Sequence, residues 1–569
     1  MKFLNSYNTK LFYGIRLILK NPRKLNGFLL KCYRLGICKT IKNYFSNSYT
    51  EYENIFDLSC KNFTILTTPH CLIIAEQIKK TLSEFGFCCE ITKDEEVLYL
   101  KSQSSIPIIL APQMFSKLPK HFVAYQLEQP ESPWFNQDYV SLLKRATFIL
   151  EYSNRNIENL IKYGIDLNKI FYCPIFPNSF SYLSNKESNS TNKEYDLIFY
   201  GAINNRRKKI LNELSYYYKI LILTEVYGEE LYRQMKRARI LLNIHYYENA
   251  ELETTRLTEG IAQGIPIVSE TSTVEIDKQF EDYVSFAKRD SVEELKKTID
   301  KELSKEKSKS IKTNKGPMDF SWFDFYLLRF ILSQDLISLD RFINHFSKTF
   351  PKLDSKICIS LPEYQDRRTK FLKQPYSDTF YLFPGLRHNL GWIGCCYSYK
   401  FLFTMSSRRH SKNLCICEDD VKFPTDISEK LKVIERFLNH NQGKWEMFAG
   451  LVSDVPRDTK ITEISKYMGI EFLFFTKTMG LVFCIFSSEA LEKLAKWEFS
   501  LDVNNNTIDK FMLTKLNKFV TILPFLVKQD ETISSTIWNG DNFSLYNAMI
   551  EGAEAKLGNI LNKYKTNNR

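Results

Sequence analysis

Short apolar runs alternate with amphipathic segments from about residue 62 onward. The runs at 62–68, 106–112 and 146–153 each have the length and flanking turn residues of a buried strand. A helical pattern at 72–85 separates the first two runs, and the helix NIENLIKYG, which Gly164 should end, follows the third. This alternation predicts parallel β-α-β units, because parallel strands need a crossover segment that is usually a helix.

A second series of the same kind begins at Tyr195, after a polar stretch at 184–194 that is typical of a linker. Its strand-like runs are YDLIFYGAI, KILILTE, ARILLNIHY and GIPIVSE. A third unit opens with KICISLP at 356–362, and its further strand candidates lie at 414–420, 481–487 and 519–527. The sequence therefore predicts an α/β protein in which two Rossmann-type halves precede a third α/β domain.

Charge is distributed unevenly along an otherwise ordinary globular chain. The 569 residues are 44% hydrophobic and 25% charged, and they contain no apolar run of 18 residues. The net charge is +12, but residues 1–50 hold ten Lys and Arg and no acid, which leaves +2 (12 − 10) for the rest. This basic leader either lies on an anionic membrane surface or packs as a helical cap on the first domain. Nucleic acid is not an expected partner, because no nucleic-acid-binding motif accompanies these cations.

The 13 cysteines indicate free thiols rather than a disulfide framework. They occur as adjacent pairs or singly within apolar runs, without the CxxC spacing of a zinc site. Thiols of this kind are typical of the reducing cytosol. The leader also lacks the uninterrupted apolar core and the cleavage site of a signal peptide. We therefore expect a cytoplasmic protein.

The first set of candidate site residues follows the opening strand of the second series. In DLIFYGAINNRRKKIL (196–211), Gly201 allows a close approach of the backbone to a ligand, and the helix that follows offers free N–H groups. Arg206 and Arg207 provide fork-shaped donors that suit phosphate oxygens. A plain turn with solvated arginines would have the same sequence.

Acidic residues lie at a defined spacing in the segment at 241–270. Glu251 and Glu259 are separated by seven residues, and Arg256 and Glu259 share one helix face. A carboxylate here can accept both hydroxyls of a ribose while Arg256 faces a diphosphate. A surface helix with an internal salt bridge is the alternative interpretation.

These residues resemble the donor-binding half of GT-B glycosyltransferases. The resemblance rests on the E-x7-E spacing, the G-x-P-x-V-S-E that follows, and an N-x-H strand (Asn243, His245). The run YQLEQPESPWF (125–135) resembles the matching acceptor-side half, so the resemblance covers about 60–345. It implies a nucleotide-sugar donor and no metal, with the leaving diphosphate stabilised by a helix dipole and an arginine. His70 and Glu128 are candidates for the general base.

A second set of candidates ends the strand LCICEDDV (414–421). Glu418, Asp419 and Asp420 are carboxylates that could hold Mn²⁺ or Mg²⁺. Blocks around them resemble, in order, glycosyltransferase family 25, over residues 355–540. These blocks are ICISLPEYQDRRTKF, GWIGCCYSYKFLF, KTMGLVFCIFSSEALEKL, TIDKFM and ILPFLVKQDETISSTI.

The resemblance to family 25 implies a GT-A fold and a divalent metal. It assigns Glu418 and Asp420 to the metal motif, with Asp419 alongside, and it places Arg367 and Arg368 near the nucleotide pocket. The chain departs from the family at Glu418, where a D-x-D motif has Asp, and at Tyr399, where many members have His.

The same resemblance implies inversion at the sugar carbon, usually from UDP-galactose. Inversion needs a base that deprotonates the acceptor hydroxyl on the face opposite the leaving diphosphate. Asp454 and Asp509 are the candidates, and a helix-capping role is the alternative for each.

Together these patterns predict a two-enzyme fusion that builds a bacterial surface glycan, such as lipooligosaccharide, lipopolysaccharide or capsule. The predicted parts are a leader (1–55), an acceptor-side half (56–183), a donor-side half with closing helices (184–350) and a family 25-like domain (351–569). The acceptor would be lipid-linked, and the enzyme would lie on the inner face of the inner membrane. The alternatives are a single active module and a glycan-binding or scaffold protein without turnover.

Overall fold

The computed structural model describes residues 60–177, 193–248, 251–272, 278–307, 320–351, 353, 355–503, 505–533 and 543–567. The chain divides into two compact units, Met1–Asp57 and Leu58–Arg569, and every described residue belongs to the second. The predicted leader and most of the predicted linker (184–194) lie outside the described residues.

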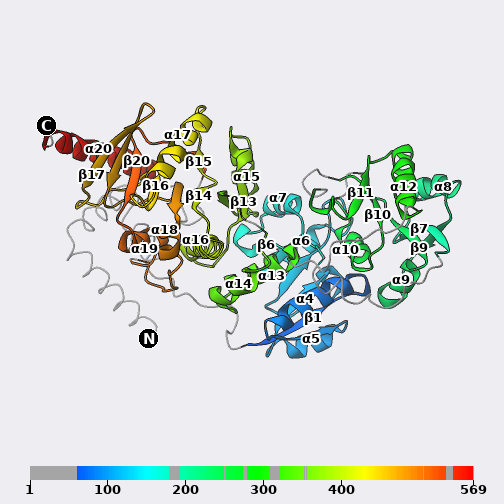
Figure 1. Cartoon of the computed structure of the whole chain (residues 1–569). Helices are drawn as coiled ribbons and strands as arrows, with labels where there is room; N and C mark the ends of the chain where they lie inside the picture. The colour runs from blue at the N-terminus through cyan, green and yellow to red at the C-terminus, as the bar shows by residue number, and fades with distance from the viewer. Residues whose placement is uncertain are drawn as a thin grey trace, which may run out of the picture. The chain divides into compact units, whose positions relative to one another are not determined.

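The first sheet has six parallel strands in the order β2-β1-β3-β4-β5-β6 (Figure 1). Its strands are β1 (Asn62–Leu66), β2 (Cys88–Thr92), β3 (Ile106–Leu110), β4 (Val123–Gln126), β5 (Phe148–Glu151) and β6 (Ile170–Tyr172). They are connected by α4 (Leu72–Glu84), α5 (Glu95–Lys101), α6 (Gln137–Arg145), α7 (Asn154–Lys162) and the short 3-10 turns η1 (Pro69–Cys71), η2 (Pro112–Met114) and η3 (Leu167–Lys169). The predicted strands and the helix at 72–85 are confirmed, whereas β2 and β4 were not predicted.

The second sheet has five parallel strands in the order β11-β10-β9-β7-β8. Its strands are β7 (Tyr195–Tyr200), β8 (Ile220–Leu223), β9 (Ala238–Asn243), β10 (Ile267–Glu270) and β11 (Val284–Ala287). Its helices are α8 (Asn205–Ser215), α9 (Gly228–Met235), α10 (Thr254–Ala262) and α12 (Val292–Lys307). The pair of Rossmann-type sheets is confirmed. Because all five strands are parallel, the loops that follow β7, β9 and β10 meet at one edge.

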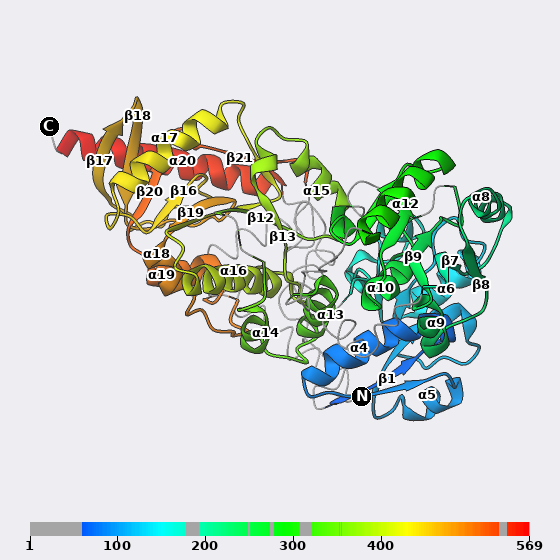
Figure 2. The ribbon, with the colours of Figure 1, turned by 45° about the vertical axis from the view of Figure 1, so that its right-hand side comes forward.

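The third unit has a mixed eight-stranded sheet in the order β13-β12-β14-β19-β16-β20-β18-β17, and a small β15-β21 ribbon. Its strands are β12 (Lys356–Ser360), β13 (Tyr381–Pro384), β14 (Asn413–Glu418), β15 (Val421–Lys422), β16 (Met447–Ala449), β17 (Ile461–Tyr467), β18 (Ile470–Phe475), β19 (Phe483–Ser487), β20 (Phe519–Ile522) and β21 (Lys528–Gln529). Its helices are α15 (Gln365–Leu372), η5 (Ser377–Thr379), α16 (Gly391–Arg408), α17 (Ile427–His440), α18 (Ser488–Leu494), α19 (Ile508–Lys515) and α20 (Phe543–Asn567). Figure 2 shows α16 beside α18 and α19, which it contacts.

Two aromatic-rich helices, α13 (Trp322–Ser333) and α14 (Leu339–Phe346), join the second sheet to the third unit. Nearly every side chain of α13 is buried, as expected for a helix that is apolar on all sides. The ring of Phe330 packs on Phe148 and Phe171 of the first sheet, with centroids 5.5 and 5.0 Å apart. Phe325 packs instead on rings of the third unit. The aromatic side chains of α13 therefore pack the first sheet and the third unit against this helix.

A buried ion network joins the first sheet, α13 and the third unit. Arg329 of α13 binds Glu363 through two hydrogen bonds of 2.7 and 3.0 Å, and Glu363 also accepts from the backbone N–H of Tyr172 at 2.9 Å. Arg387 lies 3.6 Å from Glu363 and donates to the carbonyl of Ile170. Burial would raise the pKa of Glu363, but Arg329 and Arg387 lower it to about 2. The first sheet and the third unit are therefore held together by charged side chains that are buried, with Arg387 the most exposed of them at 9%.

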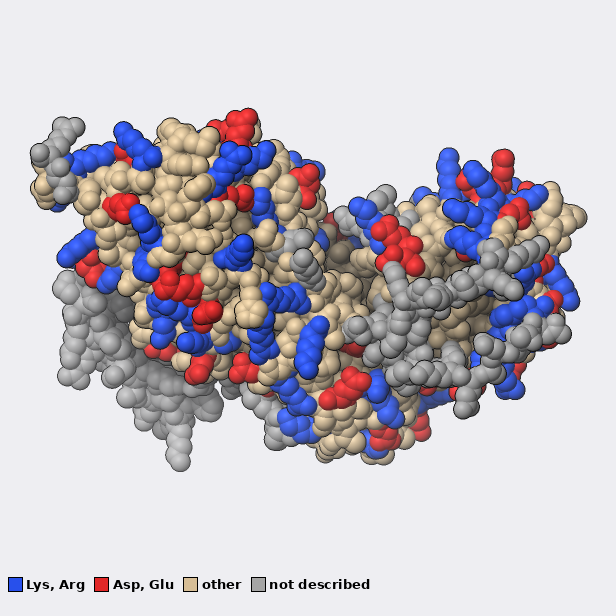
Figure 3. Space-filling view, in the orientation of Figure 1, with Lys and Arg blue, Asp and Glu red and all other residues tan. Residues whose placement is uncertain are grey.

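The state of the cysteines and the distribution of surface charge agree with what the composition predicts. The eleven cysteines in the described ranges are all free thiols. Acidic and basic side chains of the described residues are interspersed over the face drawn in Figure 3. Among the helices that the structure describes, none is long and apolar enough to cross a bilayer.

Candidate functional site

The carboxyl edge of the second sheet brings Gly201 against Arg256. Gly201 follows β7 with a φ of +121°, and a Cβ there would lie 2.9 Å from Nη2 of Arg256. Arg256 stands in the first turn of α10, is only 8% exposed and donates to the side chain of Asn243. Its Nε is buried without a hydrogen-bond partner. A guanidinium at a helix N-terminus, beside a glycine that exposes the backbone, is an arrangement that attracts an anion.

Glu259 lies one turn further along α10 and accepts a hydrogen bond from the hydroxyl of Tyr200. Burial raises the pKa of Glu259 to about 7, although Tyr200 and Arg256 act in the opposite direction. The structure thus brings Gly201, Arg256 and Glu259 together, as the spacing in the sequence predicts. The pKa means that Glu259 exchanges a proton near neutral pH.

Replacing Glu259 should change how the stability of the fold depends on pH. The pKa in the folded chain is about 7 and the ordinary value is 4.5, so the folded state holds the extra proton between these values. That contribution is complete below about pH 4 and is lost as the pH rises through 7. Glu259→Gln should therefore remove a decline of up to about 3 kcal/mol in unfolding free energy, measured by urea titration from pH 4 to pH 8. Parallel curves for the two proteins would contradict this assignment.

Glu253, which was not singled out in the sequence, is the centre of a buried polar network. Its carboxylate accepts from Nδ1 of His245 at 2.8 Å, from Asn243 at 3.2 Å, from the backbone of Tyr246 at 3.0 Å and from Arg207 at 3.0 Å. Burial would raise the pKa of Glu253, but His245 and nearby arginines lower it to about 2. His245 is thereby fixed in place by an ionised carboxylate.

Arg206 and Arg207, which were predicted to bind phosphate, form hydrogen bonds with other residues of the second Rossmann-type half. Arg206 donates to Glu270 at 2.6 and 2.9 Å and to Asp290 at 2.6 and 3.0 Å. Arg207 is 3% exposed, and burial together with the charge of Arg256 lowers its pKa to about 9. Both side chains stabilise the carboxyl edge of the second sheet, where Gly201 and Arg256 lie. Their role as direct ligands of a donor stays a prediction.

Glu251, the first acid of the E-x7-E spacing, forms hydrogen bonds with two side chains of the first Rossmann-type half, which contains the six-stranded sheet. Nη1 of Arg155 donates to its Oε1 at 3.2 Å, and the side chain of Gln129 exchanges two hydrogen bonds with its backbone. The side chain of Glu251 is only 1% exposed. Glu251 therefore lies where the two halves meet.

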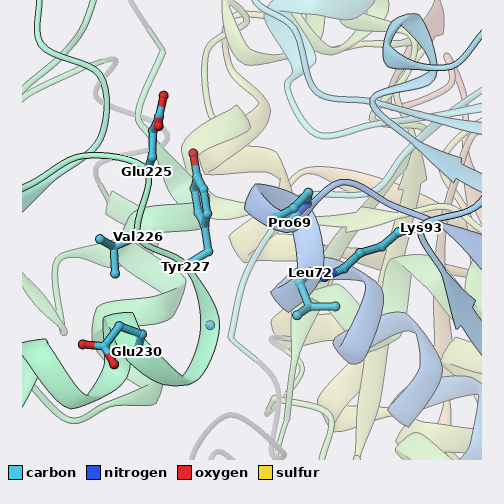
Figure 4. A pocket seen from close by; sticks show the side chains of 8 residues that line it. Pro69, Leu72, Lys93, Glu225, Val226, Tyr227 and Glu230 are labelled. Atoms are coloured by element: carbon cyan, nitrogen blue, oxygen red, sulfur yellow. The ribbon is translucent and has the colours of Figure 1, made fainter.

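A cavity of about 370 Å³ lies between side chains of the two Rossmann-type halves, and its lining does not include Glu251. Figure 4 shows Pro69, Leu72 and Lys93 of the first half on one side, and Tyr227 and Glu230 of the second half on the other. Its walls mix apolar, aromatic and charged side chains.

The two candidates for a general base in the first half lie near the same boundary. The rings of His70 and Tyr227 are 6.3 Å apart. Burial raises the pKa of the Cys71 thiol to about 12, and the charges of Glu128 and Glu259 add to the effect. The boundary therefore gathers candidate base residues and candidate donor-binding residues from opposite halves.

In the third unit, the acidic triplet that ends β14 is turned into the protein. Asp419 and Asp420 are 4% and 6% exposed. Asp419 is fully engaged, because Nε of Arg367 donates to Oδ1 at 2.8 Å and Ser360 donates to Oδ2 at 2.9 Å. Arg367 also lies 3.4 Å from Asp420. Asp419 is thus an anchor for Arg367, as the predicted placement of Arg367 near this site requires.

Glu418 and Asp420 retain oxygen atoms that could bind a cation. Oδ1 of Asp420 is buried and accepts no hydrogen bond, while Gln529 donates to Oδ2 at 3.2 Å. Burial raises the pKa of Glu418 to about 8, and the charge of Asp420 adds to the effect. Among the described residues, no three His, Cys, Asp or Glu side chains form a metal-binding group. Two carboxylates nevertheless fit Mg²⁺, which is often bound by one or two carboxylates together with substrate phosphates.

Three further predicted residues lie at different distances from the triplet. Asp509 stands in the first turn of α19. Desolvation raises the pKa of the half-buried Cys395 thiol, and the charges of Glu418, Asp509 and Asp420 add to the effect. Asp454 instead forms an exposed ion pair with Lys556 of α20 at 2.7 Å. Arg368 follows Arg367 on α15 and is half-buried.

One segment of the chain, in the second Rossmann-type half, matches a family model. Residues 188–314 match the family model described as "Glycosyl transferase-like". The matched segment contains Gly201, Arg256 and Glu259, so the edge described above belongs to a glycosyltransferase-like domain.

Other likenesses are more distant. The uncharacterized protein L137 of Acanthamoeba polyphaga mimivirus is 31% identical over 147 residues, which are 24% of this chain and 20% of L137. The chain thus spans about a fifth of that relative. Anabaena Alr3699/HepE in complex with UDP and glucose aligns at 11% identity and a TM-score of 0.30, over 43% of this chain and 90% of that chain. The lipopolysaccharide outer core galactosyltransferase WaaB aligns at 12% identity and a TM-score of 0.25, over 43% and 90%.

Proposed function

We propose that this chain is a glycosyltransferase. Its second Rossmann-type half, which contains the five-stranded sheet, binds a nucleotide-sugar donor at Gly201, Arg256 and Glu259. The observation that carries the proposal is the contact of Arg256 with Gly201 at the end of β7, within the segment 188–314 that matches a glycosyltransferase-like family. Sugar transfer from such a donor leaves a nucleoside diphosphate, and a guanidinium at a helix N-terminus opposes the charge that develops on it.

In this first site the residues have separate roles. Arg256 neutralises the leaving diphosphate, Gly201 lets its oxygens approach the backbone, and Glu259 accepts hydrogen bonds from the ribose hydroxyls. The bond from the sugar carbon to the diphosphate breaks as a bond to the acceptor oxygen forms. His70 or Glu128 of the first half takes the proton of that acceptor hydroxyl.

The third unit carries a second transfer site of the family 25 type. Glu418 and Asp420 would hold Mn²⁺ or Mg²⁺, which would supply positive charge opposite the donor diphosphate. The buried and unpartnered Oδ1 of Asp420 supports this assignment. Asp419 holds Arg367 beside the donor. Asp509 is the better candidate for the base, because Asp454 forms an exposed ion pair with Lys556.

The proposed product is a bacterial surface glycan of the lipooligosaccharide, lipopolysaccharide or capsule type. UDP-galactose is the proposed donor for the third unit, and a lipid-linked glycan at the inner face of the inner membrane is the proposed acceptor. The basic leader (1–55) holds the enzyme at that surface. Two donor sites on one chain raise the effective concentration of the first product at the second site.

A single active module is the second candidate, and one observation favours it. Arg367 already provides a cation within 3.4 Å of Asp420 and neutralises Asp419, which reduces the need for a metal. In that case the third unit binds a glycan without transferring sugar.

Metal removal separates these candidates. The full chain is incubated with UDP-galactose, UDP-glucose or UDP-N-acetylglucosamine and a lipid-linked acceptor, and both UDP release and the product masses are measured. We expect two transfers, of which one persists in EDTA and the other falls about 100-fold and recovers with Mn²⁺. A single, EDTA-resistant transfer supports the one-module candidate. Absence of UDP release with every donor would contradict the proposed function.

A further inference from the structure

Glu251 belongs to the second half, but its side chain is held by the first half. Nη1 of Arg155 donates to Oε1 of Glu251 at 3.2 Å, and Nη2 of Arg155 donates to Glu131 at 2.7 Å. The side chain of Gln129 accepts from the backbone N–H of Glu251 at 3.1 Å and donates to its carbonyl at 3.4 Å. Three side chains of the first half thus determine where Glu251 lies, directly or through Arg155.

One carboxylate oxygen of Glu251 has no hydrogen-bond partner among the described residues of the protein. This atom, Oε2, is buried and accepts no hydrogen bond. The side chain as a whole is only 1% exposed. A buried carboxylate oxygen without a partner is costly, and a hydroxyl of a bound ligand would remove that cost. In a transfer between the two halves, the sugar that moves must lie where the halves meet, which is the position of Glu251.

We infer that Arg155 is a positioning residue for sugar binding. It holds Oε1 of Glu251 and leaves Oε2 to accept a hydroxyl of the transferred sugar, so that this part of the site is complete only when the two halves are in contact. The inference rests on the proposed function. We therefore expect Arg155 to affect binding of the sugar and not of the nucleotide. The proposed function assigns the nucleotide to Arg256, Gly201 and Glu259, which form a separate group.

The charges around Glu251 predict a second effect of Arg155. Burial raises the pKa of Glu251, and Arg155 opposes the increase, while Glu131 adds to it and His245 lowers it. Removing Arg155 therefore raises the pKa of Glu251 further. The acid limb of the pH profile for transfer should move to higher pH, because a hydroxyl is accepted best by the ionised carboxylate.

The test compares the affinities for UDP and for intact UDP-sugars. Arg155→Ala, Arg155→Lys and Glu251→Gln are titrated calorimetrically with UDP, UDP-galactose, UDP-glucose and UDP-N-acetylglucosamine. Arg145→Ala is the matched control, because Arg145 is an exposed arginine of the same half. We expect Arg155→Ala to weaken binding of the preferred UDP-sugar about tenfold and to change UDP affinity less than about twofold. Arg155→Lys should recover part of the loss, and Arg155→Ala should have little further effect in a Glu251→Gln background.

Each outcome either supports or overturns the inference. Equal losses for UDP and UDP-sugar, or additive losses in the double variant, would overturn it while leaving the proposed function intact. So would an unchanged acid limb in Arg155→Ala. If Arg155→Ala fails to fold, Arg155→Gln and Gln129→Ala are measured in its place, with the same expectation for sugar-specific loss. Wild-type protein that binds UDP but no UDP-sugar overturns the inference alone, whereas protein that binds neither overturns the proposed function with it.

Discussion

The Glu363→Gln variant should lose about 3 to 5 kcal/mol of unfolding free energy, which is the cost of removing one partner from a buried ion network. Glu363 is 1% exposed and is the only acid that the structure places against both Arg329 and Arg387 within the described residues. The glutamine fills the same volume, so the loss measures charge and not packing. Two guanidinium groups would then remain buried without a counter-ion.

The network also determines which parts of the molecule should separate first. Arg329 comes from α13, Glu363 from the third unit, and the backbone N–H of Tyr172 from β6 of the first sheet. Hydrogen exchange should therefore increase in β6 and α13 of Glu363→Gln before it increases in the second sheet. Urea denaturation gives the free-energy change, and Glu90→Gln is the control.

Glu90 is half-exposed and pairs with Lys101 on the surface, where ion pairs contribute little to stability. Its replacement should leave the unfolding curve almost unchanged. If Glu363→Gln and Glu90→Gln unfold at the same urea concentration, the buried network does not hold these units together.

The second large effect is expected at Arg256. Arg256→Ala should lower the EDTA-resistant transfer by about 100- to 1000-fold, the range observed when a donor that stabilises developing negative charge is removed. Most of the loss should be in kcat, because the charge on the diphosphate grows as the bond to the sugar breaks. Initial rates of UDP release at several donor concentrations separate kcat from KM.

Three comparisons make this result interpretable. Arg256→Lys keeps the charge but loses the fork of donors, so its activity should lie between wild type and alanine. Arg239→Ala removes an arginine of the same half that pairs with Asp196 at 3.6 Å, and it should retain full activity. Asp420→Asn should abolish the metal-dependent transfer alone. Full activity in Arg256→Ala would refute the assignment of the first site.

Much of the fold and part of the site followed from local patterns. The apolar runs at 62–68 and 106–112 became strands because a buried parallel strand needs a short run of apolar residues bounded by turns. Arg256 and Glu259 met on one helix face because three residues make nearly one turn. In contrast, β2 (Cys88–Thr92) lies at the edge of its sheet and only Cys89 is buried, so it has neither the apolar run nor the regular alternation that predicts a strand.

The sequence by itself determined the periodic elements, the turn at Gly201 and the spacing from Arg256 to Glu259, because these depend on residues close together in the chain. Only the tertiary structure decided that Arg155 holds Glu251, 96 positions away, and that Glu363 lies between two buried arginines. Such pairs depend on how sheets and helices pack, and side-chain spacing along the chain contains no information about that packing.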